Sequence, residues 1–245
     1  MNMGISGMRA IALVFSARKK GNCYDFARFM LDKMKKEGVE TELVNICDYS
    51  IKPCQNCDYE CLAQIDPSTG QKIFRECPVR DDIESIWQKA WKADIFLMFV
   101  PTYGGVPPAL YVSFTQRYQS LWRKAPPREE LQKKVIAAVV LASPDGAMSG
   151  ELTPAIVAGE LRCHISMGYQ QGGFEVINNA GYKTDNVRGH LIEEEEIQNR
   201  INFTLEAGII GGVPNYGARF NSSTNPDAIV DMPHLMRFYH GGGHN

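Results

Sequence analysis

Short apolar runs alternate with longer amphipathic stretches along the first 207 residues. The first run, 9–15, predicts a strand, and the stretch 22–37 predicts a helix that Gly38 ends. The same pattern predicts strands at 39–45, 94–100, 134–142 and 173–178, and helices at 82–92, 107–124, 151–167 and 193–207. Because 95–100 and 136–141 are apolar without alternation, both faces of their strands should be buried. The order predicts an α/β protein with a doubly wound, five-stranded parallel sheet.

Two regions break this pattern. Residues 50–79, after the second strand, are rich in cysteines and turn residues, with a turn predicted at 66–70. From Gly208 onward the chain has many glycines and prolines and no periodicity, which predicts an arm over the body or over a neighbouring subunit. A disordered tail is the alternative, although apolar residues such as Phe238 and Tyr239 argue against full solvation. We therefore expect one domain, 9–207, with an insertion at 50–80 and an arm at 208–245.

Composition narrows the class of protein. The 245 residues are 44% hydrophobic and 22% charged, with a net charge of -2, so we expect a large core and no nucleic-acid partner. The acidic run 193–196 is expected to be the exposed first turn of a helix. The run 10–15 is too short to span a membrane, and its basic neighbours follow it, unlike a signal peptide. Seven cysteines, an odd number, indicate a reducing compartment, so we expect a cytoplasmic protein without membrane contact.

Four of the cysteines, Cys54, Cys57, Cys61 and Cys77, lie in the inserted segment. Thiolates are soft ligands, and four from one segment can close a tetrahedral zinc site or hold a 4Fe-4S cluster. The residues alone leave both metals open. Cys23 and Cys163 are expected to be buried packing residues, because free cysteine behaves as a small hydrophobe.

The loop after the first strand suits a phosphate. In such sheets, ligands bind at the carboxyl ends of the strands near the topological switch point. This loop carries hydroxyl, guanidinium and amide donors directly before a predicted helix N-terminus, in the run Ser16, Ala17, Arg18, Lys19, Lys20, Gly21, Asn22. It lacks the Gly-x-Gly-x-x-Gly dinucleotide fingerprint. A phosphate monoester fits, and an ordinary capped helix start is the alternative.

Two further loops should meet it at the same edge of the sheet. After the third strand, Gly104 and Gly105 let backbone amides approach a planar ligand, and Tyr103 offers a ring face or a hydroxyl. After the fourth strand, the loop 143–150 is small and polar, as a contact to a ring edge requires. Three ligand-suited loops at one edge indicate a single binding site.

The chain resembles the flavodoxin-like NAD(P)H-dependent FMN reductase family, and within it the iron-sulfur flavoproteins. Ser16, Arg18, Gly21 and Asn22 match that family's phosphate loop, with Cys23 where Thr or Ser is usual. Pro101, Tyr103 and Gly104 match the segment whose backbone contacts the isoalloxazine ring. The resemblance implies strand order 2-1-3-4-5 and FMN bound by Ser16, Arg18, Lys20, Gly21, Asn22, Cys23, Pro101, Thr102, Tyr103, Gly104, Gly105, Ser143, Asp145 and Gly146. It also implies a 4Fe-4S cluster on the four cysteines, although the long gap before Cys77 departs from the family's compact spacing.

The implied activity is hydride transfer from NAD(P)H to FMN, followed by single-electron steps through the cluster or by direct reduction of an acceptor. The partners would be small-molecule or protein electron donors and acceptors, and the assembly a homodimer or homotetramer. Two alternatives stay open: an FMN-dependent quinone or nitro-compound reductase whose cysteines bind structural zinc, and a non-enzymatic flavodoxin-like binding module.

Four aromatic residues and one arginine complete the expectations. Trp87 and Trp91, four residues apart on one predicted helix, should belong to the core. Arg117, Tyr118 and Trp122, late in the helix after the flavin loop, are expected at a subunit interface or in a substrate pocket.

Overall fold

A five-stranded parallel sheet forms the centre of the protein. The computed structural model describes residues 5–57, 61, 64–73, 75–142, 149–178 and 189–210. Its strands run β2-β1-β5-β6-β7 across the sheet, with bounds β1 Arg9–Val14, β2 Glu40–Asn45, β5 Ile95–Pro101, β6 Val135–Ala142 and β7 Gln170–Asn178. Counted within the sheet, this order is 2-1-3-4-5. The predicted flavodoxin-like fold is therefore confirmed.

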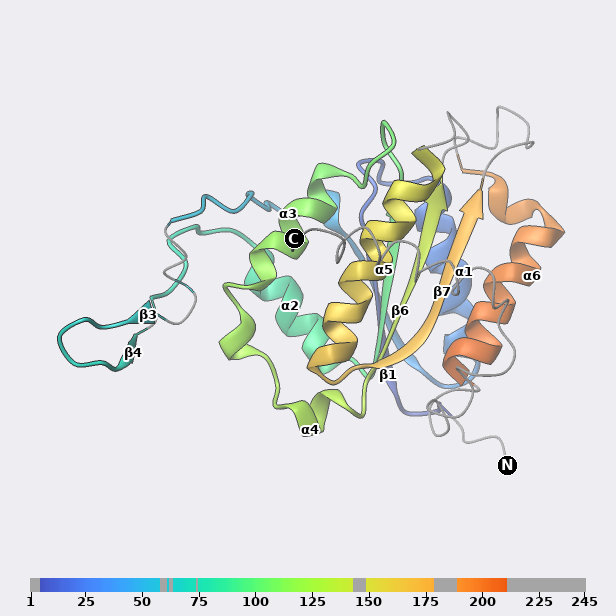
Figure 1. Ribbon diagram of the computed structural model, residues 1–245. Coiled ribbons are helices and arrows are strands. Elements are labelled where there is room, and N and C mark those ends of the chain that lie inside the picture. Colours follow the sequence, from blue (N-terminus) through green and yellow to red (C-terminus); the bar gives the residue numbers. More distant parts are fainter. Residues whose placement is uncertain are drawn as a thin grey trace, which may run out of the picture.

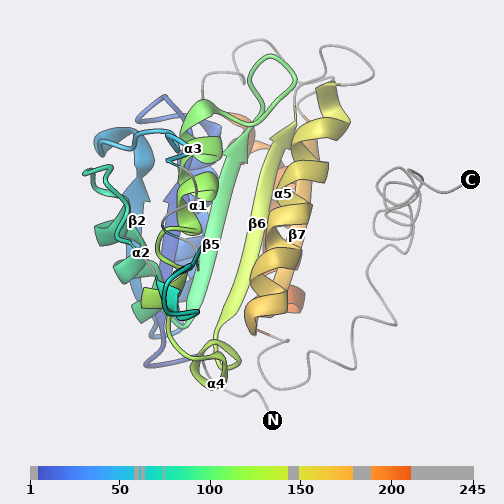
Figure 2. The same cartoon turned by 60° about the vertical axis from the view of Figure 1, so that its left-hand side comes forward.

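Helices cover both faces of the sheet. α1 (Asn22–Lys36) and α6 (Glu195–Phe203) lie on one face, and α2 (Ile83–Lys92), α3 (Ala109–Tyr118) and α5 (Ser149–Met167) lie on the other (Figures 1 and 2). Shorter helical turns complete the described chain: α4 (Arg128–Leu131), 3-10 turns at Ile46–Asp48, Trp122–Lys124 and Leu191–Glu193, and a π-helix at Thr204–Ile210. No helix in the described ranges is long and apolar enough to cross a bilayer.

Two apolar cores follow from the alternation of β1. Ile11 and Leu13 pack into the core beneath α2, α3 and α5, whereas Ala12 and Val14 pack into the core beneath α1 and α6. All seven residues of β5 are buried, as the unbroken apolar run predicted. Trp87 and Trp91 are buried as expected, and each fully buried large apolar side chain contributes roughly 1.5–3 kcal/mol.

Element ends differ from the prediction at two informative places. The helix predicted at 107–124 ends at Tyr118. The Ser120 hydroxyl donates to the Arg117 carbonyl at 2.7 Å, and it thereby competes with the backbone amide that would bond this carbonyl in a longer helix. The fifth strand begins at Gln170 rather than 173, with an irregular register opposite Ile136 and Ala137. A Cβ on Gly172 would lie 2.3 Å from Val135 Cγ1. Glycine is needed at this position for lack of space. Because glycine gives no apolar signal, the sequence pattern did not include the first residues of the strand.

The inserted segment leaves the body after β2. β3 (Gln64–Ile65) and β4 (Lys72–Ile73) form a small antiparallel hairpin that projects from the body (Figure 1). The predicted turn at 66–70 is confirmed: the Asp66 carboxylate accepts from the Ser68 amide at 2.8 Å, and the Gly70 amide donates to the Asp66 carbonyl at 2.8 Å. Hydrogen bonds from the Ser68 hydroxyl, at 2.6 Å, and from the Ser68 amide lower the pKa of Asp66 below its ordinary value.

The C-terminal part is described through Ile210. Residues 193–196 are exposed as predicted, but Glu193 belongs to the preceding 3-10 turn and α6 begins at Glu195. Helical chain continues through the π-helix to Ile210, and the rest of the predicted arm, 211–245, lies outside the described residues. Cys23 is buried as expected, but the expectation for Cys163 is wrong. Cys163 is exposed because α5 turns Leu161 and His164 toward the core, and the two residues between them, Arg162 and Cys163, face outward.

Candidate functional site

The start of α1 is buried and has no side-chain cap within the described chain. Gly21 is the N-cap, with extended backbone (φ 166°). The first intrahelical hydrogen bond runs from the Asp25 amide to the Gly21 carbonyl at 3.0 Å, so the amides of residues 22–24 have no acceptor within the helix. Asn22 and Cys23 are buried. A buried helix start of this kind favours an anion, which agrees with the predicted phosphate site.

Tyr103 joins this loop to the loop after β5. Its hydroxyl lies 2.9 Å from Ser16 Oγ and accepts from the Ala17 amide at 3.2 Å. Ser16 Oγ in turn accepts from the Arg18 amide at 3.1 Å. Because β1 and β5 are paired in parallel, their carboxyl ends are neighbours. The structure therefore brings two of the three predicted loops together.

The loop after β5 is a tight turn. Tyr103 and Val106 exchange both backbone hydrogen bonds, at 2.9 and 3.2 Å. The two central residues, Gly104 and Gly105, have φ of 57° and 86°, the positive values that a type I′ turn requires. A Cβ on Gly104 would meet nothing within 4 Å. The turn therefore presents glycine backbone to open space, as contact with a flat ring requires.

Thr102 and Pro101 complete this edge. Pro101 ends β5 and is buried, and the Thr102 amide donates to the Leu141 carbonyl at 2.9 Å. The Thr102 hydroxyl is buried with no hydrogen-bond partner among the described residues. A buried hydroxyl without a partner costs free energy, so this oxygen fits a polar group of a bound ligand.

Other predicted FMN residues have different surroundings. The Asn22 side-chain oxygen accepts from the Leu191 amide at 3.1 Å, so this atom holds the chain after β7. Burial raises the pKa of Cys23, which keeps its thiol protonated and packed. Lys20 is exposed. Ser143, Asp145 and Gly146 lie outside the described residues.

The segment after β7 was missed by the sequence reasoning. A Cβ on Gly189 would lie 3.4 Å from Gly21 Cα, so the chain at Gly189 lies against the start of α1. It follows a strand whose carboxyl end lies at the same sheet edge, and that topological rule could have indicated it.

The four predicted metal ligands are one buried and three half-buried cysteines. Cys61 is buried, and Cys54, Cys57 and Cys77 are half-buried; all four are free thiols. Burial raises the pKa of Cys61, and the charges of Cys77, Cys57 and Cys54 raise it further. Gln119 Nε2 donates to Cys54 Sγ at 3.5 Å. Within the part of the chain that the structure describes, however, no three His, Cys, Asp or Glu side chains stand in metal-binding arrangement.

Arg117 holds the base of this cysteine segment. It is 2% exposed, and its guanidinium donates to Asp81 at 2.7 Å and to the Lys52 carbonyl at 3.1 Å. Of the residues expected at an interface or in a pocket, Arg117 lines a pocket of about 420 Å³, Tyr118 is buried in the core and Trp122 is 53% exposed. Sequence reasoning missed the partner because Arg117 and Asp81 are 36 residues apart.

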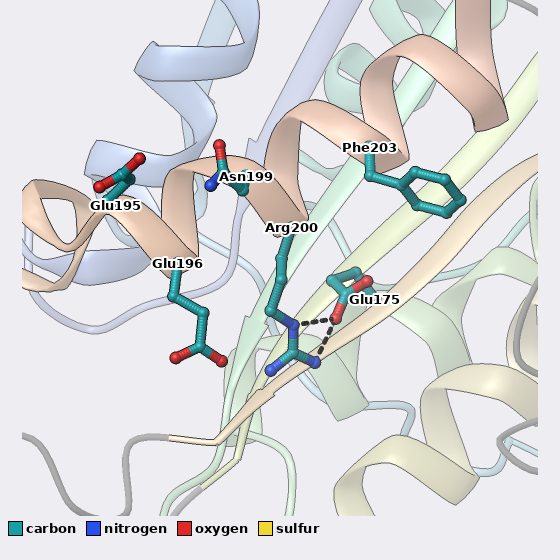
Figure 3. A pocket seen from close by; sticks show the side chains of 6 residues that line it. All are labelled: Glu175, Glu195, Glu196, Asn199, Arg200 and Phe203. Atoms are coloured by element: carbon teal, nitrogen blue, oxygen red, sulfur yellow. Dashed lines mark hydrogen bonds and ion pairs between the residues drawn. The ribbon is translucent and has the colours of Figure 1, made fainter.

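Two pockets lie away from the flavin loops. One, of about 420 Å³, lies beside Cys77 and Arg117. The other, of about 540 Å³, lies between β7 and α6 and is lined by Glu175, Glu195, Glu196, Asn199, Arg200 and Phe203 (Figure 3). There the Arg200 Nε donates to Glu175 Oε1 at 3.0 Å. Neither pocket contains a predicted FMN residue, and residues 143–148 and 179–188 lie outside the described ranges.

Comparison with known proteins settles the family. The model of the family described as NADPH-dependent FMN reductase matches residues 8–168, which include β1, both flavin loops and the cysteine segment. The chain belongs to the NADPH-dependent FMN reductase family. This confirms the predicted resemblance, and it agrees with the uncapped start of α1 and the Gly104–Gly105 turn.

Individual relatives refine the comparison. The chain is 32% identical over 104 residues to an iron-sulfur flavoprotein of Methanocaldococcus jannaschii, covering 42% of this chain and 48% of the relative. It is 30% identical over 132 residues to an iron-sulfur flavoprotein of Methanosarcina thermophila, covering 54% and 62%. The chain thus spans about half the length of these curated relatives. A crystal structure of RosB with a bound flavin intermediate superposes with a TM-score of 0.59 at 17% identity, over 94% of this chain and 88% of that one, which shows the shared fold.

Proposed function

We propose that this member of the FMN reductase family is an FMN-dependent oxidoreductase or electron-transfer protein. It would move electrons between NAD(P)H or a redox partner, FMN and a 4Fe-4S cluster on Cys54, Cys57, Cys61 and Cys77. The observation that carries the proposal is the set of four free thiols in one segment, of which Cys54 contacts Gln119 at the C-terminal end of α3. The names of the two archaeal relatives support the same centre.

The flavin loops would hold FMN by its two ends. Ser16, Arg18 and the amides at the start of α1 would bind the phosphate, and the Gly104–Gly105 turn would lie against the ring. The Thr102 hydroxyl, buried without a described partner, would donate to a polar ring atom. Bound FMN supplies hydride acceptance and single-electron transfer, while the protein supplies position and electrostatics. The loop after β6, with Ser143, Asp145 and Gly146, would close the ring edge.

The cysteine set fits a soft metal. Four thiolates match the ligand number of a cubane cluster, and the hairpin inserted before Cys77 costs little additional closure entropy. The Gln119 amide would bond a ligand sulfur, which is one of the features that set a cluster's potential. Electrons would then leave toward a small molecule or a second protein. A homodimer or homotetramer, as the family resemblance implies, would bring the cysteines of one chain near the FMN of another.

Structural zinc is the second candidate. The β3–β4 hairpin has two residues in each strand, too few to be stable alone, and it lies between Cys61 and Cys77. A zinc ion at its base would hold it in place, as in small zinc-stabilised folds. The protein would then be an FMN-dependent quinone or nitro-compound reductase without a redox-active metal.

A visible spectrum with iron, sulfide, zinc and flavin analysis on anaerobically purified protein tests these proposals. About four irons per chain together with flavin are expected, since a cubane has four irons. Flavin with zinc and no iron would replace the cluster by a structural site. Failure of the reconstituted protein to bind FMN would defeat both proposals and favour a non-enzymatic binding module.

A further inference from the structure

One guanidinium joins the two ends of the cysteine segment. Arg117, the ninth residue of α3, donates through Nη1 to the Lys52 carbonyl at 3.1 Å, where the chain enters the segment. Through Nη2 it donates to the Val79 carbonyl at 3.3 Å, where the chain returns. Cys54 lies two residues after Lys52, and Cys77 lies two residues before Val79. The same side chain therefore sets the positions of the first and the last of the four cysteines.

Asp81 completes this contact from the other side. Its carboxylate accepts from Arg117 Nη1 at 2.7 Å and from the Lys52 amide at 2.9 Å. The two side chains are 3% and 1% exposed, so the ion pair is closed to water. Next to it, the Asp82 carboxylate accepts from the Ser50 amide at 2.8 Å, and the Asp82 amide donates to the Ser50 carbonyl at 3.0 Å. The base of the segment is thus closed by hydrogen bonds rather than being a free loop.

Gln119 adds a direct contact to a sulfur. It is the C-cap of α3, two residues after Arg117, and its side-chain amide donates to Cys54 Sγ at 3.5 Å. The ten residues of α3 begin directly after the flavin turn and its two prolines. At 1.5 Å per residue the helix is roughly 15 Å long, and it fixes the separation of the flavin turn and the cysteines within one chain.

We propose that the C-terminal end of α3 is the positioning element of the cysteine centre, with Arg117 fixing the ligand backbone and Gln119 tuning the sulfur of Cys54. The inference rests on the proposed metal site at the four cysteines. Arg117 can do this because its planar fork reaches two carbonyls and a carboxylate at once, whereas lysine offers a single ammonium. A hydrogen bond to a ligand sulfur stabilises negative charge there, so it raises the reduction potential of the centre.

Cobalt binding tests the role of Arg117 without reference to activity. Co²⁺ is titrated into metal-free protein, and its thiolate absorption bands report affinity for wild type, Arg117→Met, Arg117→Lys and the surface control Arg28→Met. We expect both Arg117 variants to bind Co²⁺ about 10–100-fold more weakly, as for other residues that orient metal ligands. FMN affinity should stay unchanged in all four. Wild-type Co²⁺ affinity in Arg117→Met, or full rescue by lysine, would overturn the proposal. If Arg117→Met does not fold, Asp81→Asn, which keeps the side-chain size, replaces it.

Gln119→Leu tests the tuning role in the intact holoprotein. We expect the metal content of wild type, a lower midpoint potential and a shifted visible spectrum. An unchanged potential would overturn that role.

A thiol reagent separates failure of this proposal from failure of the metal site. Its reaction rates at Cys54 and Cys77, read by mass spectrometry on metal-free protein, should be higher in Arg117→Met than in Arg28→Met. This result would support the positioning role even if wild type binds no metal and the proposed cluster is wrong. Equal rates would overturn the positioning role whatever metal the protein holds.

Discussion

The two candidate sites are held in place by different means. Ser16 and Tyr103 follow β1 and β5, neighbouring strands whose register fixes both loops, and their side chains then meet at 2.9 Å. The cysteine segment leaves the sheet after β2 and is tied at its base to Arg117 and to the Ser50–Asp82 pair. The positions of the flavin loops are thus fixed by the sheet, whereas the position of the cysteine segment depends on hydrogen bonds from a few side chains.

This difference has a consequence for stability and function. Strand ends in a packed sheet open only with the whole domain, but a segment with few buried apolar contacts can open locally. We therefore expect changes among the cysteines to leave FMN binding intact, and changes in the flavin loops to leave the metal centre intact. This independence can be tested by changing one site and measuring ligand binding at the other.

The largest effect is expected at Cys57. Cys57→Ser should abolish the metal centre, because it removes one of four ligands, while FMN stays bound. Metal analysis and the flavin spectrum measure both. The matched control is Cys163→Ser, at an exposed cysteine on α5 outside the motif. Unchanged metal content in Cys57→Ser would rule out this ligand set, and loss of FMN would show that the two sites are coupled.

The reverse test is Arg18. Arg18→Ala should weaken FMN binding by roughly 1.5–3 kcal/mol, the range for a hydrogen bond to a charged group. Metal content should not change. Fluorescence titration of the apoprotein with FMN gives the affinity, with Arg28→Ala on the outer face of α1 as control. Equal affinities of Arg18→Ala and wild type would move the phosphate to another place.

Tyr118 tests the helix that both sites share. It packs on Trp87 in the core, with ring centroids 4.2 Å apart, and burial raises its pKa to about 12. Between pH 10 and 12 the unfolded chain loses this proton first, so the folded state binds more protons and stability falls as pH rises. From pH 9 to 11, wild type should lose about 1.4 kcal/mol more than Tyr118→Phe, one pKa unit of linkage. Urea unfolding measures this, and parallel pH curves would contradict it.

The smallest effect is expected at Tyr103. Tyr103→Phe removes the hydroxyl that contacts Ser16 and the Ala17 amide. FMN affinity should fall by about 0.5–1.5 kcal/mol, the net value of a hydrogen bond, because the Gly104–Gly105 turn keeps its own backbone contacts. A loss as large as that of Arg18→Ala would mean that this contact holds the whole phosphate loop.

Much of the fold could be predicted because buried parallel strands appear in the sequence as short apolar runs. The run 95–100 is apolar without alternation because both faces of the strand are buried. The strand order followed from the family resemblance. The start of the fifth strand was wrong because Gln170, Gln171 and Gly172 carry no apolar signal, although Gly172 is required by contact with Val135. Helix 107–124 was predicted too long because the Ser120 hydroxyl competes for a backbone acceptor.

The sites divide in the same way. The ligand-suited residues at the sheet edge and the four thiols could be predicted, because donors before a helix and clustered cysteines are local patterns. Three features depend on packing: Asn22 accepts from the Leu191 amide, Cys163 faces outward, and Arg117 closes the cysteine segment against Asp81. These contacts join residues 36 to 169 positions apart or depend on which face of a helix meets the core. The spacing of residues along the chain predicts neither the long-range contacts nor the buried helix faces, because both arise only when the helices pack on the sheet.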